Sequence, residues 1–88
     1  MAVFRNLLHD QAAGRAVMAG RALLNLTQQD VGKAVGVTQT TVANIEKGLT
    51  SVKSETREAV LDYLGRRGVS FNIDQQNKLV SLALVYIR

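Results

Sequence analysis

The 88-residue sequence contains no cysteine, no proline and no tryptophan, and its only histidine is His9. Without cysteine the chain can form neither disulfides nor thiolate metal sites, and it has no thiol nucleophile. A single histidine cannot supply the histidine cluster of a zinc site. We therefore expect no metal, no cofactor and no enzymatic activity.

The composition indicates one soluble globular domain. Hydrophobic residues make up 47% of the chain and charged residues 20%, which is typical of a folded rather than a disordered sequence. At this length a chain can bury one modest core. The formal net charge is +4, and residues 1–53 carry six Lys or Arg against three Asp or Glu. This charge allows a polyanionic partner but does not prove one.

The sequence also lacks a long apolar run. Its longest one, residues 79–87, has nine residues and is too short to span a bilayer as a helix. Residues 1–11 mix polar and apolar side chains and lack the apolar core of a signal peptide. We expect no membrane association and a cytoplasmic location. Residues 1–11 themselves could be a disordered arm, an extension of the first helix or part of a dimer contact.

Because proline is absent, glycine and Ser or Thr caps mark the ends of the predicted helices. These signals predict a mainly α-helical domain of four to five helices in residues 1–68. Its helices are expected at 12–26, at 28–35, at 39–47 and from Ser54 to about Gly65. In the first helix, spacings of three and four predict an apolar face formed by Ala16, Met18, Ala19, Ala22, Leu23 and Leu26.

Residues 27–47 have the pattern of a helix-turn-helix. Thr27 and Asp30 have the spacing of a capping box, Gly36 suits the left-handed conformation at a helix end, and Thr38 is a second N-cap. We expect the buried positions to be Ala34, Val35, Val37, Val42 and Ile45. The outer positions of the helix expected at 39–47 are mostly polar, with one charge and no aromatic residue: Gln39, Thr40, Ala43, Asn44 and Lys47.

Between about Ala16 and Leu64 the chain resembles the DNA-binding domain of the Cro and lambda-repressor family, also called the xenobiotic-response-element type. The resemblance rests on the run Leu-Thr-Gln-x-x-Val-x-x-x-Val-Gly-Val-Thr-Gln-x-Thr-Val-x-x-Ile-Glu-x-Gly, which begins at Leu26. It implies a sequence-specific DNA-binding regulator.

The resemblance also implies residue roles. Gln28 matches the position that donates to a DNA phosphate and steadies the recognition helix. Gln39 matches the first base-reading glutamine, and Thr40 and Asn44 match the next reading positions. Arg21 and Glu46 match an ion pair between the first helix and the end of the third.

The chemistry of these side chains agrees with base reading. Gln and Asn amides can each contact adenine N6 and N7, while a threonine offers its hydroxyl to any base and its methyl to thymine. Capped helix starts also present N–H groups to phosphates. The expected phosphate contacts, besides Gln28, come from Thr27, Thr38, Thr41, Lys47 and Lys53.

After Gly68 the pattern changes from helical to alternating, which predicts a β-hairpin in residues 69–88 with its turn in 74–78. Its second strand is apolar on both faces, and a lone hairpin on a helical domain covers only one. We therefore expect this strand to pair with its copy across a homodimer, through Val80, Leu82, Leu84 and Tyr86. Alternatively, the strand packs between the helices and the N-terminal residues Val3, Phe4, Leu7 and Leu8.

Two functions fit these observations. The first is a homodimeric repressor that binds an inverted repeat in double-stranded DNA through the major groove. The alternative is a helix-turn-helix module that binds another regulatory protein, as an antiactivator or antitoxin does. Such a module needs an anchor rich in Trp, Tyr or Arg, and the expected recognition face has none of these residues.

Overall fold

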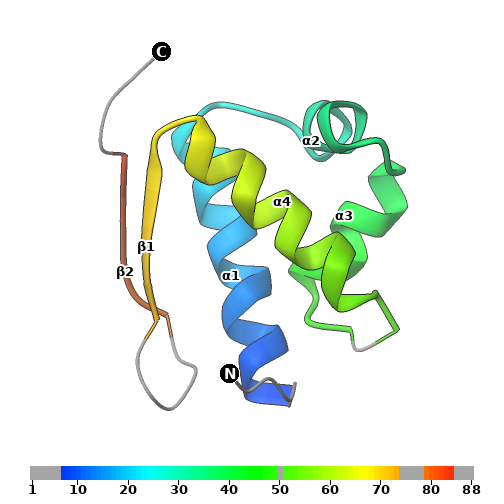
Figure 1. Cartoon of the computed structure of the whole chain (residues 1–88), viewed down its shortest axis with the longest axis horizontal. Helices are drawn as coiled ribbons and strands as arrows, with labels where there is room; N and C mark the ends of the chain where they lie inside the picture. The colour runs from blue at the N-terminus through cyan, green and yellow to red at the C-terminus, as the bar shows by residue number, and fades with distance from the viewer. Residues whose placement is uncertain (1–6, 50, 74–78, 85–88) are drawn as a thin grey trace.

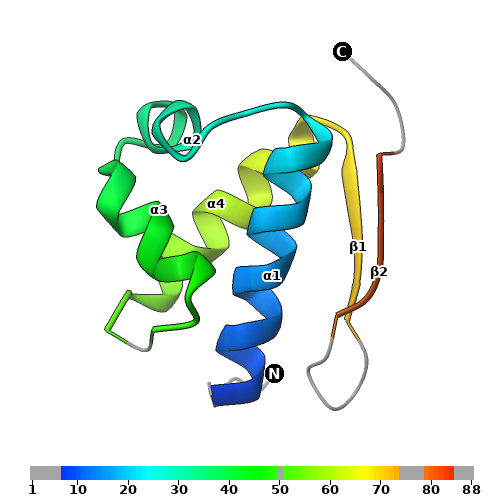
Figure 2. The same cartoon turned by 180° about the vertical axis from the view of Figure 1, so that it is seen from behind.

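The computed structural model describes the backbone of residues 7–49, 51–73 and 79–84, and the side chains of residues 11–49 and 51–70. The described elements, in chain order, are α1 (Leu7–Leu23), α2 (Gln28–Val35), α3 (Gln39–Glu46), α4 (Ser54–Arg66), β1 (Val69–Ile73) and β2 (Leu79–Leu84). Helices α1 and α4 form the middle of the molecule, with α2 and α3 on one side and the two strands on the other (Figures 1 and 2). No helix in these ranges is long and apolar enough to cross a membrane.

The core joins all four helices to β1. Its buried members are aliphatic and come from each of these elements: Val17, Val31, Val42, Ile45, Val60, Leu64 and Val69. Burial of one such side chain stabilises the fold by about 1.5–3 kcal/mol. The α2–α3 unit is therefore fixed to the rest of the domain by apolar packing through Val31, Val42 and Ile45.

The prediction for the first helix was wrong in its bounds and its buried face. Helix α1 begins at Leu7, so the residues after position 6 extend the helix. It ends at Leu23 because Asn25 has a left-handed φ of 59°. The N–H groups of Asn25 and Leu26 donate to the carbonyls of Ala22 and Arg21, the Schellman pattern of a helix end.

Of the predicted apolar face of α1, only Ala16 is fully buried. Met18 is 46% exposed and Leu23 is 44% exposed. The buried face consists mainly of small residues: Ala12, Ala13, Gly14, Ala16, Val17 and Gly20. These side chains allow α1 to approach the end of α3 closely, since a Cβ on Gly14 would lie 2.4 Å from the carbonyl oxygen of Ile45.

The strands β1 and β2 are antiparallel, with Val69 opposite Leu84 and Ser70 opposite Ala83, and a bulge after Asn72. Directly opposed residues share a face of the sheet, so Leu84 is on the face of the buried Val69. The other face carries exposed Ser70 and, opposite it, Ala83. Strand β2 also contacts α1. The predicted turn at 74–78, together with Tyr86 and Val3 and Phe4, lies outside the described residues.

The register keeps the predicted division of the second strand: Ser81 and Ala83 belong to one face, and Leu82 and Leu84 to the other. Pairing of this strand with its copy stays a prediction. Within the described two-stranded sheet, each strand has one edge with no strand beside it.

We expect Gly14→Ala to lower the free energy of unfolding by about 1–3 kcal/mol, because overpacking at the α1–α3 contact forces the helices apart. Gly65→Ala is the matched control, since a Cβ at this α4 position meets nothing within 4 Å. It should raise the free energy of unfolding by about 0.5–1 kcal/mol. Urea denaturation of the two variants measures both effects. Equal stabilisation by both substitutions would contradict the close approach at Gly14.

Candidate nucleic-acid interface

The turn between α2 and α3 depends on two glycines. Gly36 has a φ of 87°, in the left-handed region predicted for it. The N–H groups of Gly36 and Val37 both donate to the carbonyl of Gly32, at 2.8 Å. A Cβ on Gly32 would lie 2.7 Å from the carbonyl oxygen of Val37. Position 32 therefore has no room for a side chain, and this lets the chain fold back tightly into α3.

The buried positions of the helix-turn-helix differ in part from the prediction. Val42 and Ile45 are buried and Val35 and Val37 pack against the core, but Ala34 is exposed. Instead α2 buries Val31 and Gly32, which the sequence analysis missed. The spacing of four between Val31 and Val35 is the signal that identifies this face.

Both helices have the N-terminal caps predicted for them. The Thr27 hydroxyl accepts from the N–H of Asp30 at 3.0 Å, and the Asp30 carboxylate accepts from the N–H of Thr27 at 2.9 Å. The Thr38 hydroxyl accepts from the N–H of Thr41 at 3.1 Å. The hydroxyls of Thr38 and Thr41 also lie 3.0 Å apart. A hydroxyl both donates and accepts. The Thr27 hydroxyl therefore keeps its hydrogen for an external acceptor, and of the two hydroxyls of Thr38 and Thr41 one keeps its hydrogen.

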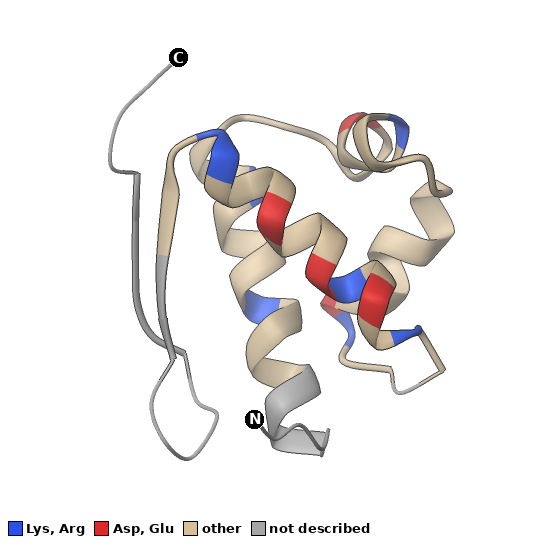
Figure 3. Cartoon of the chain, in the orientation of Figure 1, with Lys and Arg blue, Asp and Glu red and all other residues tan. Residues whose placement is uncertain are grey.

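The outer side of α3 faces solvent. Gln39 and Thr40 are exposed, and Ala43 and Asn44 are partly exposed, whereas Val42 on the inner side is fully buried. Most of α3 carries no charge (Figure 3). Lys47 follows its last turn, and Lys47 and Lys53 are both exposed in the segment that leads to α4. The interface therefore has an uncharged polar centre with cations at one end.

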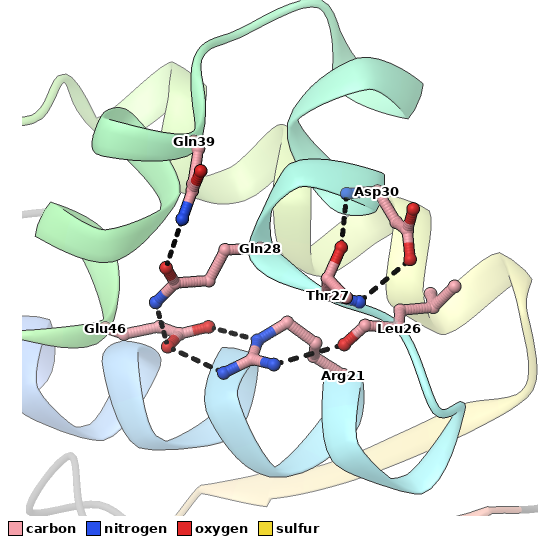
Figure 4. Close-up of polar contacts among 7 residues, drawn as sticks. All are labelled: Arg21, Leu26, Thr27, Gln28, Asp30, Gln39 and Glu46. Carbon is pink, nitrogen blue, oxygen red and sulfur yellow. Dashed lines mark hydrogen bonds and ion pairs between the residues drawn. The ribbon is translucent and has the colours of Figure 1, made fainter.

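A buried carboxylate connects α1, α2 and α3 (Figure 4). Arg21 of α1 donates to Glu46 of α3 through Nε to Oε2 at 2.7 Å and through Nη2 to Oε1 at 3.1 Å. Its Nη1 donates to the carbonyl of Leu26 at 3.1 Å. Gln28 of α2 donates through Nε2 to Glu46 Oε1 at 2.9 Å, and its own Oε1 accepts from Gln39 Nε2 at 3.5 Å. The side chain of Glu46 is 4% exposed.

The contact with Glu46 stabilises the charged form of Arg21. The hydrogen bond to Glu46 raises the pKa of Arg21 above its ordinary value, although partial burial opposes this shift. Arg21 therefore stays charged at neutral pH. Removing one member of a buried ion pair costs about 3–5 kcal/mol, and the 22% exposure of Arg21 reduces this cost here.

Two contacts in this region were not predicted. The resemblance paired Arg21 with Glu46 and gave Gln28 a phosphate contact and a role in steadying the recognition helix, but it named no contact between Gln28 and Glu46, which the structure adds. The other is Arg57 of α4, 3% exposed, which donates through Nη1 to the carbonyl of Val52 at 3.0 Å. It holds the segment after α3 against the start of α4.

Two short helices, a tight glycine turn and an exposed polar second helix define a helix-turn-helix, a unit that places its second helix in the DNA major groove. Comparison with protein families agrees with the geometry: the helix-turn-helix model HTH_3 matches residues 17–70, more than half of the chain. The chain belongs to this family of Cro/C1-type helix-turn-helix proteins, and is thus a DNA-binding transcription regulator. No curated protein matches the chain. Among the described residues, no three His, Cys, Asp or Glu side chains gather as a metal site.

The capping box predicts a pH effect. The hydrogen bond from the backbone N–H of Thr27 lowers the pKa of Asp30 below its ordinary value. A carboxyl whose pKa is lower in the folded state stabilises the fold above its unfolded pKa, and this stabilisation is lost as the pH falls through the folded value. The excess stability of the wild type over Asp30→Asn should therefore be constant near neutral pH and should shrink below about pH 4.

Carbon-13 titration of the Asp30 carboxyl, with urea denaturation of both proteins at each pH, measures this effect. A midpoint for Asp30 at or above the ordinary aspartate value would contradict the capping box.

Proposed function

We propose that the protein is a homodimeric repressor that reads an inverted repeat in double-stranded DNA with α3. The observation that carries this proposal is the outer side of α3. It presents amide, hydroxyl and methyl groups and no charge, on a helix whose start is capped and whose end is fixed by Glu46. An ordinary solvated helix face would favour Lys and Glu, which are better helix formers than Thr and Asn.

In this proposal four side chains read base edges: Gln39, Thr40, Ala43 and Asn44. The two amides suit adenine, the threonine hydroxyl suits either a donor or an acceptor, and the methyl groups suit thymine. Two of the four, Gln39 and Thr40, are in the first turn of α3, the part of a recognition helix that contacts base edges.

Phosphate contacts would surround this centre. Thr27, Thr38 and Thr41 each belong to a cap that keeps a hydroxyl hydrogen for a phosphate oxygen, and Lys47 and Lys53 supply positive charge. Gln28 uses one hydrogen of its NH2 group on Glu46, so the second can donate to a phosphate. With few cations per copy, the salt dependence of one copy is shallow, and useful affinity needs two copies.

The second copy would pair through β2. Strand β2 has one open edge in the described sheet. Between Leu79 and Leu84 it contains neither proline nor a charged residue, the features that usually protect an edge from pairing. Antiparallel pairing of Val80, Leu82, Leu84 and Tyr86 with their copies would form a four-stranded sheet. The two α3 helices would then enter successive major grooves, about 34 Å apart. A dimer bound across a promoter represses by occupying it.

Selection of bound fragments from random DNA tests the reading of bases. We expect the selected sequence to be an inverted repeat. In Asn44→Ala the preference for the selected base over the other bases should fall about tenfold at one base pair of each half-site, since a bidentate contact discriminates by about 1–3 kcal/mol. Lys53→Ala should weaken binding to all sequences alike. Ala59→Ser, at an exposed position of α4, is the control. Loss of affinity without any change of base preference in Asn44→Ala would contradict the proposal.

Sedimentation equilibrium tests the dimer, which should have about twice the 9.6 kDa mass of one chain. Ala83→Lys should weaken it, because the charge on β2 meets the partner strand. Ser70→Lys adds the same charge on the directly opposed residue of β1, away from the partner, and should leave the dimer intact. A monomeric wild type would contradict the pairing and favour a β2 edge that accepts a strand of another protein.

A further inference from the structure

The hydrogen bonds around Glu46 have a fixed direction. An ionised carboxylate only accepts, and this one is nearly fully buried and receives both arms of the Arg21 fork. The third group against it is the side-chain amide of Gln28, whose nitrogen lies 2.9 Å from Oε1. If this amide were turned round, two oxygens would meet without a hydrogen between them. Gln28 must therefore turn its NH2 group toward Glu46 and its carbonyl oxygen away.

The direction of the Gln28 amide also determines the direction of the Gln39 amide at the start of α3. The Oε1 atom of Gln28 faces the Gln39 amide, and the Nε2 atom of Gln39 donates to it at 3.5 Å (Figure 4). Gln39 is exposed, so its carbonyl oxygen and its second N–H point outward as one acceptor and one donor. That pair matches the N6 amino group and N7 of adenine. In the reverse orientation the outward donor and acceptor exchange places, so the pair no longer matches N6 and N7 of adenine in that order.

We propose that Glu46 is a positioning residue for base specificity: its buried carboxylate fixes the direction of the Gln28 amide, and Gln28 in turn fixes Gln39 in the orientation that selects adenine. This inference rests on the proposed role of Gln39 in reading a base. It adds that the specificity of an exposed residue is set by a buried charge on the same helix, seven positions further along the chain.

Glu46→Gln tests this proposal with nearly the same side-chain shape. The oxygen of the new amide keeps the shortest bond, from Arg21 Nε at 2.7 Å. Its NH2 group then takes the place of Oε1, where it faces Gln28 and where Arg21 Nη2 loses its acceptor. Gln28 then turns its oxygen toward residue 46 and its NH2 group toward Gln39, so Gln39 reverses. At the base pair read by Gln39, the ratio of affinities for A·T and G·C should fall by roughly tenfold or more.

Two further variants separate positioning from stability. Arg21→Lys removes the fork but keeps the carboxylate, so it should lower the unfolding temperature and leave the A·T to G·C ratio unchanged. The double variant Gln28→Glu with Glu46→Gln moves the carboxylate to position 28, where it accepts from residue 46 and from Gln39. It should restore the ratio of the wild type, even though added negative charge beside the DNA weakens binding to every sequence.

Competition binding with the selected operator and its single A·T to G·C variants gives these ratios. Nuclear Overhauser effects in the free protein give the amide directions without DNA. In the wild type the NH2 protons of Gln28 should lie near the Hγ protons of Glu46; in Glu46→Gln they should lie near those of Gln39.

A folded Glu46→Gln protein with the ratio of the wild type would overturn the proposal, and so would an equal change of ratio in Arg21→Lys. If Glu46→Gln does not fold, the Overhauser effects of the wild type test the proposal on their own. NH2 protons of Gln28 that lie near Gln39 instead of Glu46 would overturn it. A wild type without base preference would refute the proposed function alone, because the amide directions are measured without DNA.

Discussion

The ion pair between Arg21 and Glu46 is the interaction on which the arrangement of α3 depends. It joins α1 to the last turn of α3, and the remaining Nη1 of Arg21 holds the carbonyl of Leu26 just before α2. Gln28 then joins the first turn of α2 to the same carboxylate. Three helices therefore meet at one buried charge, and α3 cannot rotate or slide without breaking several charge-assisted hydrogen bonds.

Packing around this charge is equally restrictive. Gly14 lets the backbone of α1 contact the end of α3, and Gly32 lets α2 contact the turn. Most members of the buried core are valines, and their branched shape leaves few rotamers. A rigid support of this kind keeps the exposed side chains of α3 in fixed positions, which reduces the entropy lost on binding DNA.

Much of this could be predicted from the sequence where the signal is local. Thr27, Asp30 and Gly36 mark the ends of α2 correctly because caps involve residues three or four apart. The buried face of α1 could not be predicted this way, because it is chosen by a backbone contact at Gly14 with a helix about 30 residues away. For the same reason the bond between Gln28 and Glu46, 18 residues apart, was missed although both residues were identified. Asn25 was a local signal for the end of α1 that the sequence analysis overlooked.

The central claim, that α3 reads base edges in the major groove, is tested most directly by replacing single adenines of the selected operator with 7-deazaadenine. This change removes the N7 acceptor and leaves base pairing intact. The account predicts a loss of affinity of about tenfold at the adenine contacted by Gln39 in each half-site, and no such loss at that position in Gln39→Ala. Equal affinity for every substituted operator would contradict it.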